Sequence, residues 1–272
     1  MPMRRFSIPL ALLLSVSLLA LTPLPTAAQS AQSIAEEMKA RYQEQLKNVE
    51  NYVVETSMYT SYHRKVMKDG APALETEVKM KGQSESSLFS AMGNAPTTTS
   101  SKPAYYEDLS KNATYAGSET VNGVKCHVLR VKDASKMESD AQEMTYHIDA
   151  EQYVPMQMKM MQPPQQGGGK PTEVVVNFED YRTTKGITLP WRTTMQMKMS
   201  MSKQERQRMQ KMMKQLENLP EAQREMMKNQ MPMSFERMKK IMSGEPTTIE
   251  VKDVRVNEGI PEGVFGSSGS EG

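Results

Sequence analysis

The sequence predicts an α+β fold that is mainly β: an incomplete antiparallel β-barrel with an N-terminal helix and an inserted helical lid. Three patterns support this prediction. Apolar residues recur at helical spacing between residues 34 and 46, then alternate with polar residues in nine short stretches, and return to helical spacing at about residues 202–244. Because antiparallel strands that follow one another along a chain tend to form one curved sheet or a barrel, we expect the helical insertion to fold back over that sheet.

Residues 1–28 are predicted to be a cleavable signal peptide. Arg4 and Arg5 give it a positive start, an apolar run over residues 8–21 follows, and small residues at positions 26–28 suit cleavage. The apolar run is shorter than the about 20 residues that a membrane-spanning helix needs. We therefore expect an exported protein that is soluble once the signal peptide is removed.

Composition narrows the classes to which the exported chain can belong. Cys126 is the only cysteine and lies far from the cleavage site, where a lipoprotein carries the cysteine that is acylated, so the protein is not expected to be a lipoprotein itself. Cys126 alternates with Val124 and Val128 in a predicted strand, which predicts a small core residue. Without the two signal-peptide arginines, 32 basic residues balance 32 acidic ones, which argues against a nucleic-acid partner. The remaining length suits one domain at 29–266 with a flexible tail at 267–272.

The first predicted element is one amphipathic helix. Ser33 and Glu36 match the Ser-x-x-Glu capping box, in which each side chain bonds a free backbone N–H group at the helix start. Apolar residues follow at helical spacing through Leu46, so the helix should end near residue 49.

Alternating stretches then predict nine strands separated by turns. The stretches lie at about residues 52–58, 61–68, 74–81, 124–132, 143–149, 154–161, 173–179, 188–201 and 247–256. Turn signals stand at Asp69-Gly70, Asn122-Gly123, Lys185-Gly186 and Gly167-Gly168-Gly169. Residues 93–103, which are rich in Thr, Ser and Pro, are predicted to form a surface loop.

The lid, residues 202–244, is predicted to contain three helices. A second capping box starts the first at Ser202, and Pro220 and Pro232 open the other two. The residues expected to cover the sheet are Met209, Met212, Met213, Leu216, Met226, Met227, Phe235, Met238 and Met242. Ten basic residues oppose five acidic ones between positions 203 and 242, so the outer face either attracts an anionic membrane surface or is simply solvated.

Methionine is the anomaly of the composition, with 26 residues, of which 13 lie between Met195 and Met242. In two predicted strands every second residue is methionine, which places these side chains on one face of the sheet. Exposing such a face to water would forgo about 1.5–3 kcal/mol per side chain. The strand methionines expected to line an apolar cavity are Met156, Met158, Met160, Met195, Met197, Met199 and Met201.

The methionines admit three interpretations. They fill an ordinary core, they form a deformable cavity for varied apolar ligands because methionine is unbranched and polarizable, or their thioethers bind Cu(I). Met209 and Met213 share a helix face, but methionines two apart in a strand stand roughly 7 Å from each other. No His or Cys is interleaved with them, so no metal site and no cofactor are assigned.

No motif indicates catalysis, so we expect a protein that is not an enzyme. The three histidines, His63, His127 and His147, fall in separate strand stretches and lack the spacing of metal ligands. The sequence contains no Gly-x-Ser-x-Gly, no Ser-x-x-Lys and no Gly-rich phosphate loop followed by a helix. We therefore assign no catalytic residues.

Several segments of the second half resemble one known family. The segments are 117–126, 146–150 with 153–155, 178–182 with 186–190, and 254–261. In one segment a strand ends in an Asp turn (Tyr-His-Ile-Asp-Ala), and a new strand starts after Pro. A second hairpin runs from Phe-Glu-Asp-Tyr-Arg to Gly-Ile-Thr-Leu-Pro, and the last strand ends in Glu-Gly-Ile-Pro. In order and spacing, over roughly residues 115–265, they are similar to the LolA-like, outer-membrane lipoprotein-sorting carriers of the bacterial periplasm.

The resemblance implies a periplasmic carrier that binds acyl chains of lipoproteins or lipids in an apolar cavity beneath helices, without catalysis. It also implies membrane-anchored donor or acceptor proteins as partners, and we expect a monomer. Two alternatives remain open. One is a methionine-rich periplasmic Cu(I)-binding protein, and the other is a non-catalytic envelope interaction module that docks through its basic lid.

Overall fold

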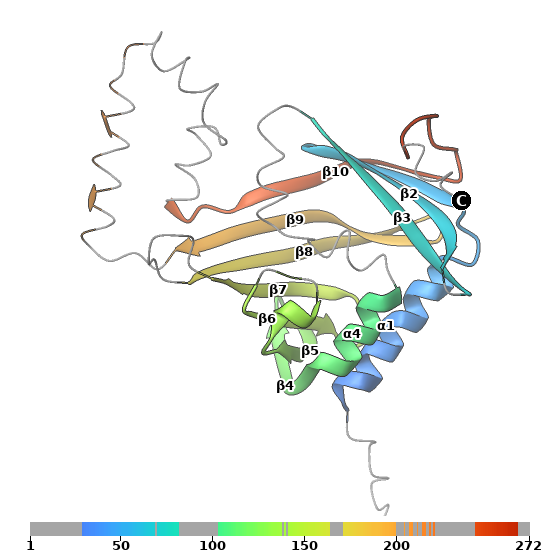
Figure 1. Ribbon diagram of the computed structural model, residues 1–272, viewed down its shortest axis with the longest axis horizontal. Coiled ribbons are helices and arrows are strands. Elements are labelled where there is room, and N and C mark those ends of the chain that lie inside the picture. The colour runs from blue at the N-terminus through green and yellow to red at the C-terminus, as the bar shows by residue number, and fades with distance from the viewer. Residues whose placement is uncertain are drawn as a thin grey trace, which may run out of the picture.

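Ten antiparallel strands form one open sheet, and two helices lie side by side on one of its faces (Figure 1). This computed structural model describes residues 29–68, 70–81, 103–137, 139, 141–163, 171–199 and 243–265, with a few single residues between 204 and 220. The strand order is β3-β2-β1-β10-β9-β8-β7-β6-β5-β4, so the last strand pairs with the first and the sheet ends at β3 and β4. The predicted mainly β fold, an incomplete antiparallel barrel with an N-terminal helix, is confirmed.

All nine predicted strands are confirmed. A tenth strand, β4, lies between the third and fourth predicted strands in the sequence. The strands are β1 (Asn51–Thr56), β2 (Tyr59–Lys68), β3 (Ala71–Met80), β4 (Ala113–Val121), β5 (Val124–Val131), β6 (Glu143–Asp149), β7 (Pro155–Gln162), β8 (Thr172–Thr184), β9 (Ile187–Met199) and β10 (Thr247–Val256). The helices are α1 (Ala31–Gln45), α4 (Pro103–Asn112) and the short 3-10 helix η1 (Ala134–Met137).

Helix α1 begins earlier than the sequence predicted. Its N-cap is Ser30, whose Oγ accepts a hydrogen bond from the Ser33 backbone N–H at 3.0 Å, while Ser33 Oγ accepts from the Ser30 N–H at 3.1 Å. The capping box predicted at Ser33 and Glu36 is therefore wrong, because Ser33 itself takes the third helical position that Glu or Gln usually occupies. The helix also ends at Gln45 rather than near residue 49.

Helix α4 and strand β4 were not predicted. The predicted loop at 93–103 lies outside the described residues except for Pro103, which occupies the first position of α4, where a missing N–H costs nothing. Tyr106 and Leu109 bury the helix against the core, and the Tyr106 ring lies 5.5 Å from that of Tyr42 on α1. The two helices thus pack as a pair on the sheet.

The hairpin turns predicted at Asn122-Gly123 and Lys185-Gly186 are confirmed. The φ angles are 50° and 83° in the first turn and 47° and 91° in the second. Two successive positive φ angles define the type I′ turn, whose twist matches that of paired strands. These turns fix the pairing of β4 with β5 and of β8 with β9.

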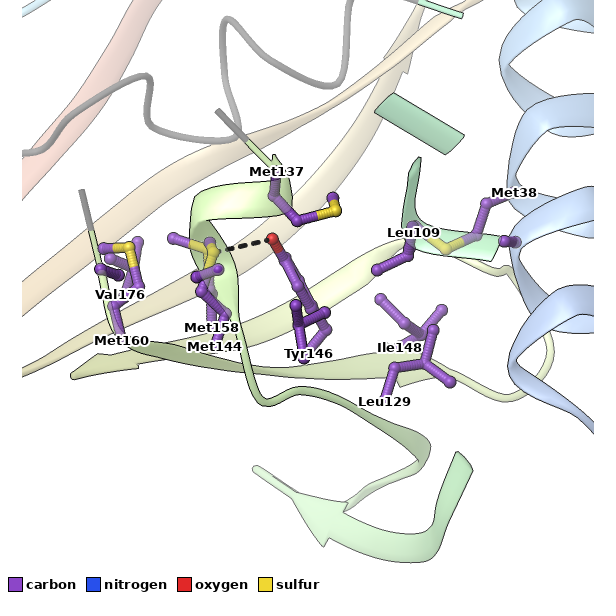
Figure 2. Close-up of a cluster of buried hydrophobic side chains, with 14 of the residues drawn as sticks. Met38, Leu109, Leu129, Met137, Met144, Tyr146, Ile148, Met158, Met160 and Val176 are labelled. Carbon is purple, nitrogen blue, oxygen red and sulfur yellow. Dashed lines mark hydrogen bonds between the residues drawn. The ribbon is translucent and has the colours of Figure 1, made fainter. Parts of the chain in front are cut away.

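The main core lies between the two helices, η1 and the inner face of strands β5–β9. Methionines fill one end of it: Met144, Met158 and Met160 lie on one side of Tyr146 and Met137 lies near its hydroxyl, which donates to the Met144 sulfur at 3.5 Å (Figure 2). Cys126 is fully buried in a separate small cluster, which confirms it as a core residue.

The predicted lid, signal peptide and tail lie almost entirely outside the described residues. Strand β9 ends at Met199 and β10 begins at Thr247, and the first pair of their ladder joins Met195 to Thr247. The segment predicted to form the lid therefore connects two neighbouring strands, and its helices and its cover of the sheet stay predictions.

Candidate ligand cavity

A cavity of about 170 Å³ lies between the helices and the inner face of the sheet. Its walls come from the C-terminal half of α1, from α4, from β1–β3 and from β8–β10. Seven of the chain's ten tyrosines line it: Tyr42, Tyr52, Tyr59, Tyr105, Tyr106, Tyr153 and Tyr181. Elements separated by some 200 residues of chain build this one space.

The cavity lining is apolar and carries no net charge. Leu46, Val54, Leu74, Ile187 and Ile249 are among its aliphatic residues. Among the described residues that line it, none is Lys, Arg, Asp or Glu. Since an unpaired charge is costly in such surroundings, the cavity suits an uncharged apolar group.

The tyrosine rings support one another as well as the cavity wall. The rings of Tyr105 and Tyr106 meet edge to face at 5.3 Å, and Tyr105 contacts Tyr146 of the core in the same way at 6.3 Å. Burial raises the pKa of Tyr52, Tyr105, Tyr106 and Tyr181 well above the ordinary value of a phenol. Their hydroxyls therefore stay protonated at any physiological pH.

One corner of the cavity is polar. Ser61 Oγ lies 2.9 Å from Nε2 of His63, and Thr76 Oγ1 lies 2.9 Å from Nδ1 of the same ring. The imidazole also stacks on Tyr52, with ring centroids 4.2 Å apart and planes 12° from parallel. Burial lowers the pKa of His63 to about 3, so the imidazole is neutral near pH 7.

The contact between Ser61 and His63 does not form an activated nucleophile. A general base works best with a pKa near the operating pH, and His63, with a pKa of about 3, is too weakly basic to take the serine proton. The partner that orients the ring is the hydroxyl of Thr76 rather than a carboxylate. The corner offers hydrogen bonds to a ligand.

The other two histidines lie outside the cavity and do not converge with His63. The Gln29 side-chain amide donates to Nε2 of His127 at 3.3 Å, and Nε2 of His147 donates to Glu119 at 3.0 Å. Within the described part of the chain, no group of three His, Cys, Asp or Glu side chains could hold a metal ion.

The described strand methionines lie mainly in the core rather than on the cavity wall. Met158, Met160 and Met195 are at most 4% exposed in the main core, and Met197 packs against it half-buried. Met156 is buried beside Cys126. None of these five methionines is among the residues that line the cavity.

The remaining candidate methionines fall where the structure gives no side-chain description. These are Met199, Met201 and the lid residues Met209, Met212, Met213, Leu216, Met226, Met227, Phe235, Met238 and Met242. The predictions of a methionine-covered lid and of Cu(I) binding by its sulfurs therefore stay predictions.

The tyrosines and the polar corner were missed by the sequence reasoning. The signal available was composition, since the chain has ten tyrosines and only five phenylalanines. A second signal was the inward-facing alternation of Tyr59, Ser61 and His63 in one strand, which places aromatic and polar groups where aliphatic ones are usual. Neither signal states which other elements face that strand.

Comparison with known proteins finds matches among solved structures alone. No protein-family model and no curated protein matches the sequence. Among solved structures, a DUF1329 family protein from Desulfovibrio piger aligns with a TM-score of 0.49 and 11% identity, over 88% of this chain and 99% of its own. An outer membrane lipoprotein-sorting protein domain from Vibrio parahaemolyticus aligns with a TM-score of 0.45 and 14% identity, over 86% and 95%.

A LolA superfamily protein from Nitrosomonas europaea aligns over 88% of this chain and 98% of its own, with a TM-score of 0.39 and 12% identity. No helix in the described ranges has the length and hydrophobicity that a membrane crossing requires.

Proposed function

We propose that this chain is a non-catalytic periplasmic carrier that binds an acyl chain of a lipoprotein or lipid in the tyrosine-lined cavity. The observation that carries the proposal is the cavity itself: an uncharged, largely apolar space of about 170 Å³ between a curved sheet and two helices. The sequence resemblance to lipoprotein-sorting carriers supplies the class of cargo. Membrane-anchored donor or acceptor proteins would be its partners, and the monomer its working form.

The driving force for such binding is the removal of methylene groups from water, worth about 0.8 kcal/mol for each buried CH₂. An engineered apolar cavity of about 150 Å³ takes up benzene. The cavity of about 170 Å³ therefore has room for a short segment of an acyl chain, and the rest of a long chain must displace packed side chains or extend outside the cavity.

The methionine core provides the means of enlargement. Met38, Tyr106 and Phe178 belong both to the cavity wall and to the core that contains Met158 and Met160. Because a methionine side chain has three rotatable bonds, it changes shape at a small cost in packing. We expect a long chain to enter at the tyrosines and to push into the methionine end, while the lid closes over it.

The test is binding of a fluorescent acyl methyl ester, together with native mass spectrometry of protein purified from a bacterial envelope. Val251 lines the cavity from β10, and Thr248 lies exposed on the same strand outside the lining. Val251→Trp should fill the cavity and lower probe affinity at least tenfold, whereas the control Thr248→Trp should leave it within twofold. A chain that is always ligand-free and takes up no acyl probe would refute the carrier function.

A further inference from the structure

Two buried tyrosines hold hydroxyl groups toward the cavity without a partner. Tyr52 and Tyr106 line the cavity and are 6% and 7% exposed. Neither hydroxyl makes a hydrogen bond to any described residue. Within that part of the chain, the polar atoms sealed away without a partner are Nδ1 of His127, Nδ1 of His147 and Nε1 of Trp191, so both tyrosine oxygens are open to the cavity.

Both hydroxyls are donors at every physiological pH. Burial and the nearness of other tyrosine hydroxyls raise the pKa of Tyr52 and Tyr106, so neither ionises. A buried donor without a partner is costly, and a ligand that brings an acceptor oxygen would remove that cost. The neutral His63 ring stacks on Tyr52 and places no charge beside it, and its two nitrogens are already bonded to Ser61 and Thr76.

The cavity lacks what a free fatty acid would need. An ionised carboxylate taken out of water requires a cation, and the described lining residues include no Lys or Arg. The nearest imidazole, that of His63, is neutral. An ester carbonyl accepts the same hydrogen bonds as a carboxylate but carries no charge that must be compensated.

We propose that Tyr52 and Tyr106 recognise the uncharged carbonyl oxygen of an acyl ester, and that this site selects esterified acyl chains over free fatty acids. The inference rests on the proposed carrier function and names its ligand class. The apolar remainder of the cavity holds the first methylenes of the chain, and the two hydroxyls fix the position of the carbonyl group.

The experiment compares three ligands of matched length by displacement of the fluorescent acyl ester at pH 8: methyl dodecanoate, dodecanoic acid and tridecane. A neutral hydrogen bond is worth about three- to tenfold in affinity. We expect methyl dodecanoate to bind at least tenfold more tightly than dodecanoic acid and about three- to thirtyfold more tightly than tridecane.

The variants test which groups read the carbonyl. Tyr52→Phe with Tyr106→Phe should bring the affinity for methyl dodecanoate down to that for tridecane and leave tridecane unchanged. Tyr62→Phe is the matched control, because Tyr62 lies on β2 but outside the cavity lining, with Lys79 over its ring at 5.7 Å. The two single Phe variants, each expected to lose about three- to tenfold for the ester, serve if the double variant does not fold.

Two results would overturn the proposal: dodecanoic acid binding as tightly as its methyl ester, or the Phe variants weakening tridecane and ester equally. If none of the three ligands binds, the carrier function itself is wrong. Equal binding of all three contradicts the carbonyl site alone.

Discussion

The two ends of the inner face use different side chains and reach different packing. At the β5–β8 end, methionines pack beside Tyr146 in a filled core (Figure 2). At the β1–β3 and β10 end, tyrosines surround an open space of about 170 Å³. One sheet and one pair of helices serve both ends, so the side chains rather than the backbone decide where a ligand has room.

The physical reason is the shape and polarity of the two side chains. Methionine rotates about three bonds and fills irregular gaps, whereas a tyrosine ring is rigid and its hydroxyl needs a partner. Rings that brace one another, such as Tyr105 against Tyr106, cannot collapse into the space beside them. The flexible methionine end therefore forms the filled core, and the rigid tyrosine end keeps open the cavity that we propose as the binding site.

The largest expected effect is the difference in stability between the variants Met158→Ala in the filled end and Leu189→Ala in the open end. Met158 is fully buried in the core, so its truncation should cost about 2–5 kcal/mol in the free energy of unfolding. Leu189 lines the existing cavity half-buried, and its truncation should cost about 1 kcal/mol, because it enlarges a space that already exists. Urea denaturation measures both, and equal losses would contradict the division into a filled end and an open end.

The next largest effect is the pH dependence contributed by His63. The unfolded chain binds a proton there below about pH 6.5, but the folded protein does so only near pH 3, so stability falls as the pH drops through this window. The wild-type protein should lose about 2 kcal/mol from this group between pH 7.5 and pH 5.

The control is His63→Gln, whose amide can still bond Ser61 and Thr76 but does not titrate. The variant should be less stable than the wild type at pH 7.5, and the gap should narrow by about 2 kcal/mol at pH 5. Urea denaturation at the two pH values gives the comparison. A gap that stays constant would mean that His63 is not held neutral.

A smaller effect is expected when methionine is exchanged for leucine. Met158→Leu with Met160→Leu conserves apolar volume and should change the free energy of unfolding by less than about 1.5 kcal/mol per site. If methionine flexibility lets long chains enter the core, the double variant should weaken binding of a hexadecanoyl ester more than that of an octanoyl ester. Displacement titrations with the two esters measure the change in affinity. Equal weakening of both would mean that the methionine end takes no part in binding long chains.

The sequence predicted what depends on neighbouring residues and missed what depends on distant ones. Asn122-Gly123 specifies its hairpin because both residues accept positive φ, and the alternation of strand residues shows which side of the sheet they occupy. Helix α4 escaped prediction because ten residues form a helix mainly through tertiary packing, here of Leu109 and Tyr106. The cavity could not be predicted because Tyr52 and Val251, which are far apart in the sequence, line the same space only when β1 pairs with β10.

Replacement of residues 203–243 by a short Gly/Ser loop should have the smallest effect on stability. Its main effect should be on the rate at which a bound ligand dissociates. Because Met195 pairs directly with Thr247, a short connection can join β9 to β10 without breaking their ladder. If this segment does not pack on the core in the ligand-free protein, the free energy of unfolding should change by less than about 0.5 kcal/mol. If the lid closes over a bound chain, the acyl ester should dissociate several times faster while the selection of ester over free acid stays unchanged. Stopped-flow release of the fluorescent ester measures the rate, and an unaltered rate would show that the tyrosine end alone retains the ligand.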